Sequence, residues 1–139
     1  MNLKVVLSLA SVSILIGAAT SFGLTQGLEW FFWVTLALFS AYLIGKREPQ
    51  RPVSHGFLVG MLSGLLSSAT ESLFFDYYIT NNPAAADRLA RIAQGIDPRL
   101  FILLSGAIIG LAAGIAFAVL ALLAGRLETG RFRPSPPEK

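Results

Sequence analysis

Apolar residues dominate the chain in four long runs, separated by shorter polar segments. The runs cover about residues 3–24, 28–44, 56–79 and 100–125. Each is long enough, or nearly so, to cross a hydrocarbon core of roughly 30 Å as a helix rising about 1.5 Å per residue. A helix satisfies its own backbone hydrogen bonds, as a lipid environment requires. The pattern therefore predicts an all-α integral membrane protein, a four-helix bundle built from two transmembrane hairpins.

The longest polar connection, between the third and fourth runs, predicts a short amphipathic helix. Asn82 followed by Pro83 is typical of a helix N-cap and first turn, and Gly95 is placed to end the helix. Such a helix would lie on the outer surface with its apolar side toward lipid or the bundle. An ordered connector is favoured here over a binding lid.

The two ends of the chain bound the predicted domain. Residues 1–127 form the four-span domain, and residues 128–139 are a polar, proline-rich tail expected to be disordered. The first run also allows a second interpretation, a cleaved signal peptide. A retained helix is favoured, because the run exceeds the usual signal length and lacks a clean small-x-small cleavage site.

Composition supports a membrane protein, and the placement of charge adds an orientation. Hydrophobic residues make up 54% of the chain and charged residues only 14%, against roughly a quarter charged in soluble domains. With the N-terminus inside, eight basic residues face the cytoplasm and three face outward, a clear positive-inside bias. The inner set is Lys4, Lys46, Arg47, Arg51, Arg126, Arg131, Arg133 and Lys139, and the outer set is Arg88, Arg91 and Arg99. The protein is therefore predicted to lie in a cell (inner or plasma) membrane, with both termini in the cytoplasm.

Aromatic residues agree with this topology. Trp30 and Trp33 begin the second run, and Tyr77 and Tyr78 end the third. Both pairs fall at the outer side, where interfacial anchors are enriched.

Small residues on the last two runs predict how those helices pack. In lipid, small side chains allow helix backbones to approach closely. The two faces are expected to meet in a hairpin, and the pattern indicates packing and not an activity. The set comprises Gly56, Gly60, Gly64 and Ser68 on one helix and Gly106, Gly110 and Gly114 on the other.

Glu71 is the most informative polar residue, because it lies within the third run. A charge near the centre of a membrane helix costs about 2.5 kcal/mol or more. With Ser67 and Ser63 nearby on the same face, Glu71 is a candidate proton or cation relay or polar contact. The alternative, which is favoured, is a hydrogen-bonded packing residue.

Other chemistry finds little support. Cysteine is absent and His55 is the only histidine, so thiolate chemistry is excluded and no metal or haem site is expected. No catalytic set or phosphate loop is present, and no enzyme activity or cofactor is predicted. His55 is interpreted as an interfacial polar residue, Glu29 as a helix-start residue, and Asp76 as a helix-end charge that faces water or pairs with Arg99 or Arg91.

The order of the later segments resembles an uncharacterised family of four-helix bacterial membrane proteins, catalogued as a domain of unknown function. The resemblance rests on residues 54–57 before a glycine-rich helix, the aromatic segment 74–78, then Asn82 and Pro83, an amphipathic stretch and a glycine-rich last helix. It implies a bacterial inner membrane and supplies no activity.

Two functions remain open from the sequence. The first is an accessory subunit or scaffold of a membrane complex, in which small-residue faces such as Ser11, Gly17 and Ala18 meet other membrane subunits or a second copy. The alternative is a small proton- or cation-coupled transporter or channel that uses Glu71. The lipid bilayer is an expected partner in either case, and nucleic acid is not.

Overall fold

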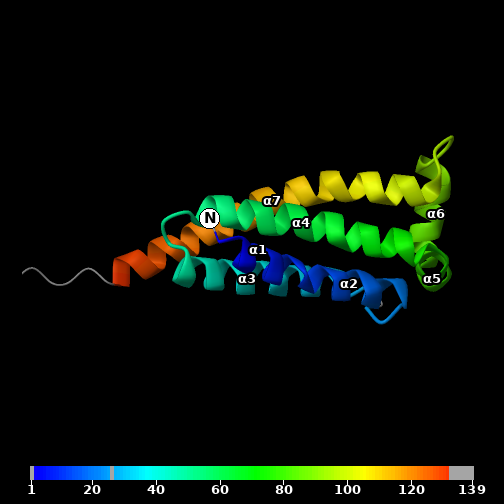
Figure 1. Ribbon diagram of the computed structural model, residues 1–139. Helices are drawn as coiled ribbons and strands as arrows, with labels where there is room; N and C mark the ends of the chain where they lie inside the picture. The colour runs from blue at the N-terminus through cyan, green and yellow to red at the C-terminus, as the bar shows by residue number, and fades with distance from the viewer. Residues whose placement is uncertain (1, 26, 132–139) are drawn as a thin grey trace, which may run out of the picture.

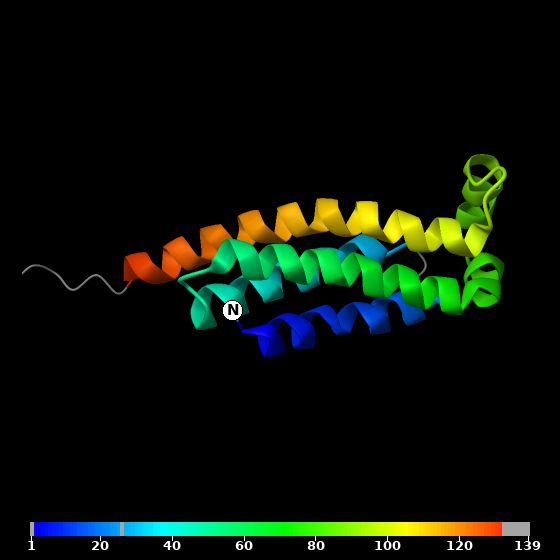
Figure 2. The same cartoon turned by 45° about the horizontal axis from the view of Figure 1, so that its top comes forward.

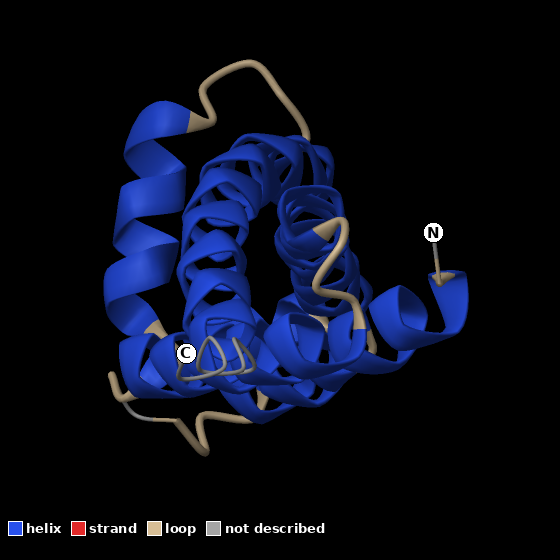
Figure 3. Ribbon diagram, turned by 90° about the vertical axis from the view of Figure 1, so that its left-hand side faces the viewer, coloured by secondary structure: helices blue, strands red, loops and turns tan. Residues whose placement is uncertain are grey.

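The computed structural model describes residues 2–25 and 27–131, and within them all regular structure is helical (Figure 3). Three helical stretches are long and apolar enough to cross a membrane: Leu3–Ser21, Pro52–Leu73 and Pro98–Glu128. This result fits a membrane protein. The helices are α1 (Leu3–Ala10), α2 (Val12–Ser21), α3 (Glu29–Arg47), α4 (Pro52–Leu73), α5 (Phe75–Asn81), α6 (Pro83–Ile92) and α7 (Pro98–Arg131).

The long helices lie side by side along one axis. The N-terminal pair α1–α2 runs along α4, which lies between this pair and α7 (Figure 2). Helix α4 contacts α1, α2, α3 and α7. The first turn of α1 lies at the same end as the last turns of α7, whereas α5 and α6 turn across the opposite end (Figure 1). The buried core joins all the long helices through Val6, Leu9, Ile16, Leu36, Ala37, Ile44, Val59, Phe117 and Ala121.

Helix α3 is the shortest of the predicted crossings and the least apolar. Its 19 residues carry Glu29 at one end and Lys46 and Arg47 at the other, and two tryptophans lower its hydropathy further. These are the residue types that favour the interface at both ends of a membrane helix. For this reason α3 is not among the helices that are apolar enough to span a membrane by composition. It packs mainly along α7 and also contacts α4.

The third apolar run does not form one helix to residue 79. Helix α4 starts earlier, at Pro52, and ends at Leu73, after which a turn at Phe74 redirects the chain into α5. Phe22 holds this turn, since its ring lies 5.4 Å from that of Phe74 and 5.2 Å from that of Tyr77. The aromatic end of the run therefore belongs to α5, which forms a cross-piece at the end of the long helices, and not to α4.

Two asparagines fasten this cross-piece to the end of α2. The side-chain amide of Asn82 donates to the Thr20 carbonyl at 2.9 Å, and that of Asn81 donates to the Ser21 carbonyl at 3.2 Å. These carbonyls belong to the last turn of α2, where helix acceptors have no partner within the helix. Gly23, with φ +72°, ends α2 by allowing the chain to turn back on itself.

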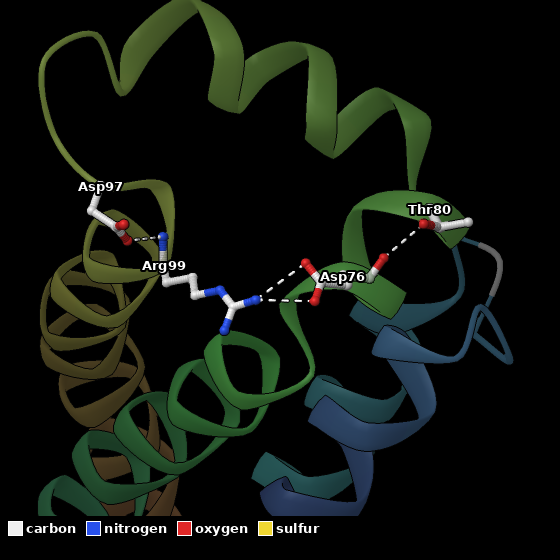
Figure 4. A network of polar contacts seen from close by, with 4 residues as sticks. All are labelled: Asp76, Thr80, Asp97 and Arg99. Atoms are coloured by element: carbon white, nitrogen blue, oxygen red, sulfur yellow. Dashed lines mark hydrogen bonds and ion pairs between the residues drawn. The ribbon is translucent and has the colours of Figure 1, made fainter.

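Helix α6 begins and ends near the expected positions. Asn82 is its N-cap residue, Pro83 its first residue, and Ile92 its last. Gly95 then adopts φ +82° in the loop that leads to α7. The end of the connector is fixed by Asp97, whose Oδ1 accepts the backbone N–H of Arg99 at 2.9 Å and so caps α7 (Figure 4).

An ion pair joins α5 to the first turn of α7 at this end. Arg99 Nη2 lies 3.0 Å from Asp76 Oδ2 and 3.1 Å from Asp76 Oδ1 (Figure 4). Both side chains are at least half exposed. The contribution to stability is therefore about 0–1 kcal/mol, as for other surface pairs. Of the two partners considered for Asp76, the structure selects Arg99.

Helix α7 is longer than any expected run. Its 34 residues correspond to about 51 Å, more than a hydrocarbon core of roughly 30 Å requires. The helix continues to Arg131, so it includes the first four residues of the segment 128–139 predicted as a tail. The remainder of that predicted tail, residues 132–139, lies outside the described residues.

Glycines bring α4 and α7 into backbone contact. A methyl group on Gly60 would lie 2.5 Å from the carbonyl oxygen of Ala113, and one on Gly56 would lie 2.6 Å from that of Phe117. On the facing helix, a methyl on Gly110 would lie 2.6 Å from the Met61 carbonyl oxygen. The remaining members of the set, Gly64, Ser68, Gly106 and Gly114, lie in the same interface.

His55 occupies a different environment from the interface expected for it. Its side chain is fully buried at the end of the bundle that carries the N-terminus. Nδ1 lies 2.8 Å from the Arg51 carbonyl oxygen and therefore donates to it, while Nε2 accepts the backbone N–H of Asn2 at 3.0 Å. Glu48 completes the cluster, accepting the Asn2 side-chain amide at 3.0 Å. His55 thus ties the start of α1 to the α3–α4 connection.

The glycine contacts predict a sharp difference between two alanine substitutions. Gly64→Ala should lower the free energy of unfolding by about 1–3 kcal/mol, because the new methyl group meets the backbone of Gly110. Gly125→Ala should leave it unchanged or raise it by up to about 1 kcal/mol, because its methyl group would sit 3.4 Å from Pro52 Cγ, an ordinary contact. Reversible unfolding in mixed micelles measures both. Equal effects of the two substitutions would contradict this account of the interface.

Candidate functional site

Glu71 lies in the last turns of α4, and its side chain lines a small polar cavity. The Ser67 hydroxyl, one turn earlier, donates to Glu71 Oε1 at 3.1 Å. The cavity has a volume of about 180 Å³, enough for several water molecules at roughly 30 Å³ each. It is lined by Thr20, Glu29, Trp33, Gly64, Ser67, Ser68, Glu71, Tyr78 and Ile109.

Glu29 supplies a second carboxylate to the same cavity. It occupies the first turn of α3, and the Thr25 hydroxyl lies 3.2 Å from its Oε1. The Thr25 side chain is buried, and its hydroxyl also lies 3.4 Å from the Thr20 hydroxyl. Thr25 therefore links the Glu29 carboxylate to the end of α2. Two acidic side chains from different helices thus border one small volume.

Two aromatic side chains complete the wall. Trp33 comes from α3, one turn after Glu29, and Tyr78 comes from α5. Burial raises the pKa of Tyr78 to about 12, and the neighbouring carboxylates of Glu71 and Glu29 act in the same direction. The phenol therefore stays protonated and remains a hydrogen-bond donor at the cavity edge.

A second, more open chamber adjoins the first. Its volume is about 280 Å³, and Glu29 and Tyr78 line both chambers. The remaining wall comes from the α2–α3 loop, the end of α5 and the start of α6, including the exposed Arg88. The inner cavity therefore faces the end of the bundle that carries α5 and α6 (Figure 1).

The structure separates the residues that the sequence grouped with Glu71. Ser67 bonds to it and Ser68 lines the cavity. Ser63 is fully buried one turn further along α4, outside the cavity lining, and its hydroxyl has no hydrogen-bond partner among the described residues. From Gly64 toward the start of α4, the backbones of α4 and α7 are in close contact and leave no room for the cavity to continue between them.

The four expected interfacial anchors divide into two kinds. Trp30 and Tyr77 are exposed, with 64% and 57% of their surface accessible. Trp33 and Tyr78 instead line the cavity. Side chains four residues apart share a helix face, so the spacing of Glu29 and Trp33 was a usable signal that both point the same way. No sequence signal placed that face opposite Glu71.

The cavity chemistry is acidic. Two carboxylates and four hydroxyl-bearing residues line it, and no Lys, Arg or His is among the described residues of its wall. Among the described residues, no three His, Cys, Asp or Glu side chains gather in a way that would hold a metal ion. The arrangement can hold a proton on a carboxylate or bind a small cation, because either neutralises charge in a confined, low-dielectric space.

Fold and cavity together define an all-helical protein whose membrane-length helices surround a small acidic cavity near one end. Comparison of the chain with known protein families, curated proteins and solved structures finds no match.

Proposed function

We propose that this chain is a non-enzymatic, multi-pass membrane protein that reversibly binds a proton or small cation in the cavity of Glu71 and Glu29. The observation that carries the proposal is the pairing of these two carboxylates around one cavity, with Ser67 bonded to Glu71. An acidic residue in a membrane helix is a functional candidate by default, and a second acidic residue at the same volume strengthens that case.

The proposed topology has four crossings, with both termini in the cytoplasm of a cell membrane. Its support is the excess of Lys and Arg in the segments assigned to the cytoplasmic side. The described parts of these segments, namely the first turn of α1, the α3–α4 connection and the last turns of α7, lie at the same end of the structure (Figure 1). In this orientation α5 and α6 face outward, and the cavity exchanges its occupant with the outer side. The resemblance to bacterial four-helix membrane proteins favours an inner membrane.

Binding from one side is favoured over conduction through the chain. Beyond the cavity, α4 and α7 are in backbone contact at Gly60 and Gly56. At the far end, His55 and Val59 are fully buried. A continuous polar route through one copy therefore lacks support, so transport would need a rearrangement or another chain.

The accessory-subunit function is the second proposal, and the outer face of α7 favours it. Only 28% of the apolar, membrane-length stretch of α7 is buried inside the structure, compared with 50% of the corresponding stretch of α4. Ile108 and Ile115 are exposed by 75% and 57%. The small-residue face expected on the first helix is weaker support, because Gly17 packs inside the chain against Ser67.

Orientation can be tested by single-cysteine labelling, because the natural chain has no cysteine. Ala90→Cys, in α6, should react with a membrane-impermeant maleimide in intact spheroplasts. Gln50→Cys, in the α3–α4 connection, should react only after permeabilisation. Labelling of Gln50→Cys in intact spheroplasts would contradict the proposed topology, and Ala90→Cys controls for reagent activity.

Carboxyl modification tests the proposed cavity function. Dicyclohexylcarbodiimide couples to protonated carboxyl groups in apolar surroundings, so it should modify Glu71 in the purified protein, at a rate that falls as pH rises. Peptide mass spectrometry locates the product. Glu71→Gln should abolish it, whereas Asp76→Asn, at the exposed ion pair with Arg99, should leave the rate unchanged. A chain that is unmodified at Glu71 at every pH would overturn the proposal.

Native mass spectrometry of the gently extracted protein tests the accessory-subunit proposal. A stoichiometric unlike partner is expected, and Ile108→Ser with Ile115→Ser on the exposed face of α7 should release it. The matched control, Leu73→Ser, changes an exposed apolar residue of α4. Detection of only a monomer or a homo-oligomer would contradict this second proposal and leave the cavity proposal unaffected.

A further inference from the structure

We propose that the occupant of the Glu71 cavity is a small organic ammonium ion. This inference rests on the proposed cation-binding function and names the class of cation. The combination of two carboxylates, Glu29 and Glu71, with two aromatic side chains, Trp33 and Tyr78, around one volume supports it.

The lining fits an ammonium group in two respects. Carboxylates neutralise its charge, and aromatic faces attract alkylated ammonium ions, which are more weakly hydrated than metal ions. Cages of aromatic side chains are a recurrent mode of recognition for quaternary ammonium ligands. Trp33 and Tyr78 come from different helices, α3 and α5, so the fold supplies two walls of such a cage around the carboxylates.

The size of the cavity argues against a bare metal ion. Hard cations are held by six or more oxygen ligands at about 2.3–2.6 Å in protein sites. Here two carboxylates and four hydroxyl groups line a volume of about 180 Å³, several times the roughly 30 Å³ of one water molecule. Their oxygen atoms are therefore spread too widely to surround one bare metal ion. An ion with a few carbon atoms fills this space and contacts Trp33 and Ile109. A sodium ion is too small to make these contacts, so water would occupy the space beside the two side chains.

The charges along the route direct a cation inward. In the outer chamber Glu29 is accompanied by Arg88, and the two charges offset one another. Among the described residues, the lining of the inner cavity adds the Glu71 carboxylate and includes no Lys, Arg or His. The potential thus becomes more negative with depth, and low-dielectric walls strengthen this effect. Glu29, which borders both chambers, is the carboxylate that a cation meets first.

A fluorescence titration tests the inference with tetramethylammonium as the probe. Trp30→Phe leaves Trp33 as the single tryptophan, inside the cavity wall. Tetramethylammonium chloride should change its emission in a saturable way, at a half-saturating concentration about tenfold or more below that of sodium chloride at constant ionic strength. Adding Glu71→Gln should raise the tetramethylammonium value about tenfold, whereas adding Asp76→Asn should not change it.

Protection of the wild-type protein gives an independent measurement that needs no variant. Tetramethylammonium should slow carbodiimide modification of Glu71, and sodium at the same concentration should not. If both ions protect equally, or neither does while Glu71 is still modified, the ammonium inference fails and the proposed function stands. If Glu71 is never modified, both fail. If the fluorescence variants do not give a monodisperse protein, the wild-type protection result decides.

Discussion

Backbone contact between α4 and α7 is the constraint on which the rest of the molecule depends. In lipid, the burial of apolar surface contributes little to helix association, so close packing and polar contacts must replace it. Glycines such as Gly60 and Gly110 allow carbonyl oxygens of one helix to lie against the backbone of the other. Because this contact admits almost no side chain, it fixes the rotation of α4, and with it the direction in which every other residue of α4 projects.

That rotation brings the polar residues of α4 to the other helices. Ser67 meets Gly17 of α2, where a methyl group would lie 2.8 Å from the Ser67 carbonyl oxygen. Glu71, one turn further, then faces a cavity shared with α3 and α5. A carboxylate is costly in lipid and less costly beside a hydroxyl and water-sized space. The packing that stabilises the bundle therefore also creates the one environment in which Glu71 is tolerated.

The two ends of the bundle differ in their chemistry. At the end with α5 and α6, aromatic rings and asparagine side chains hold a cross-piece over a polar, accessible volume. At the other end, His55 is buried and bonded to the first described residue, Asn2, and to Arg51. One end is built around an open polar space and the other around a closed hydrogen-bond cluster. This asymmetry supports the proposed binding from a single side.

The sequence by itself determined the helical class, the position of most apolar runs, the helix that starts at Pro83, and Glu71 as the residue to examine. These follow from local pattern: run length, helix-breaking residues and the rarity of an acidic group among apolar neighbours. Only the tertiary structure decided that α4 stops at Leu73, that His55 is buried, and that Glu29, Trp33 and Tyr78 share a cavity with Glu71. Periodicity reports which residues share a face of one helix, but the partner of that face depends on contacts between residues far apart in the chain.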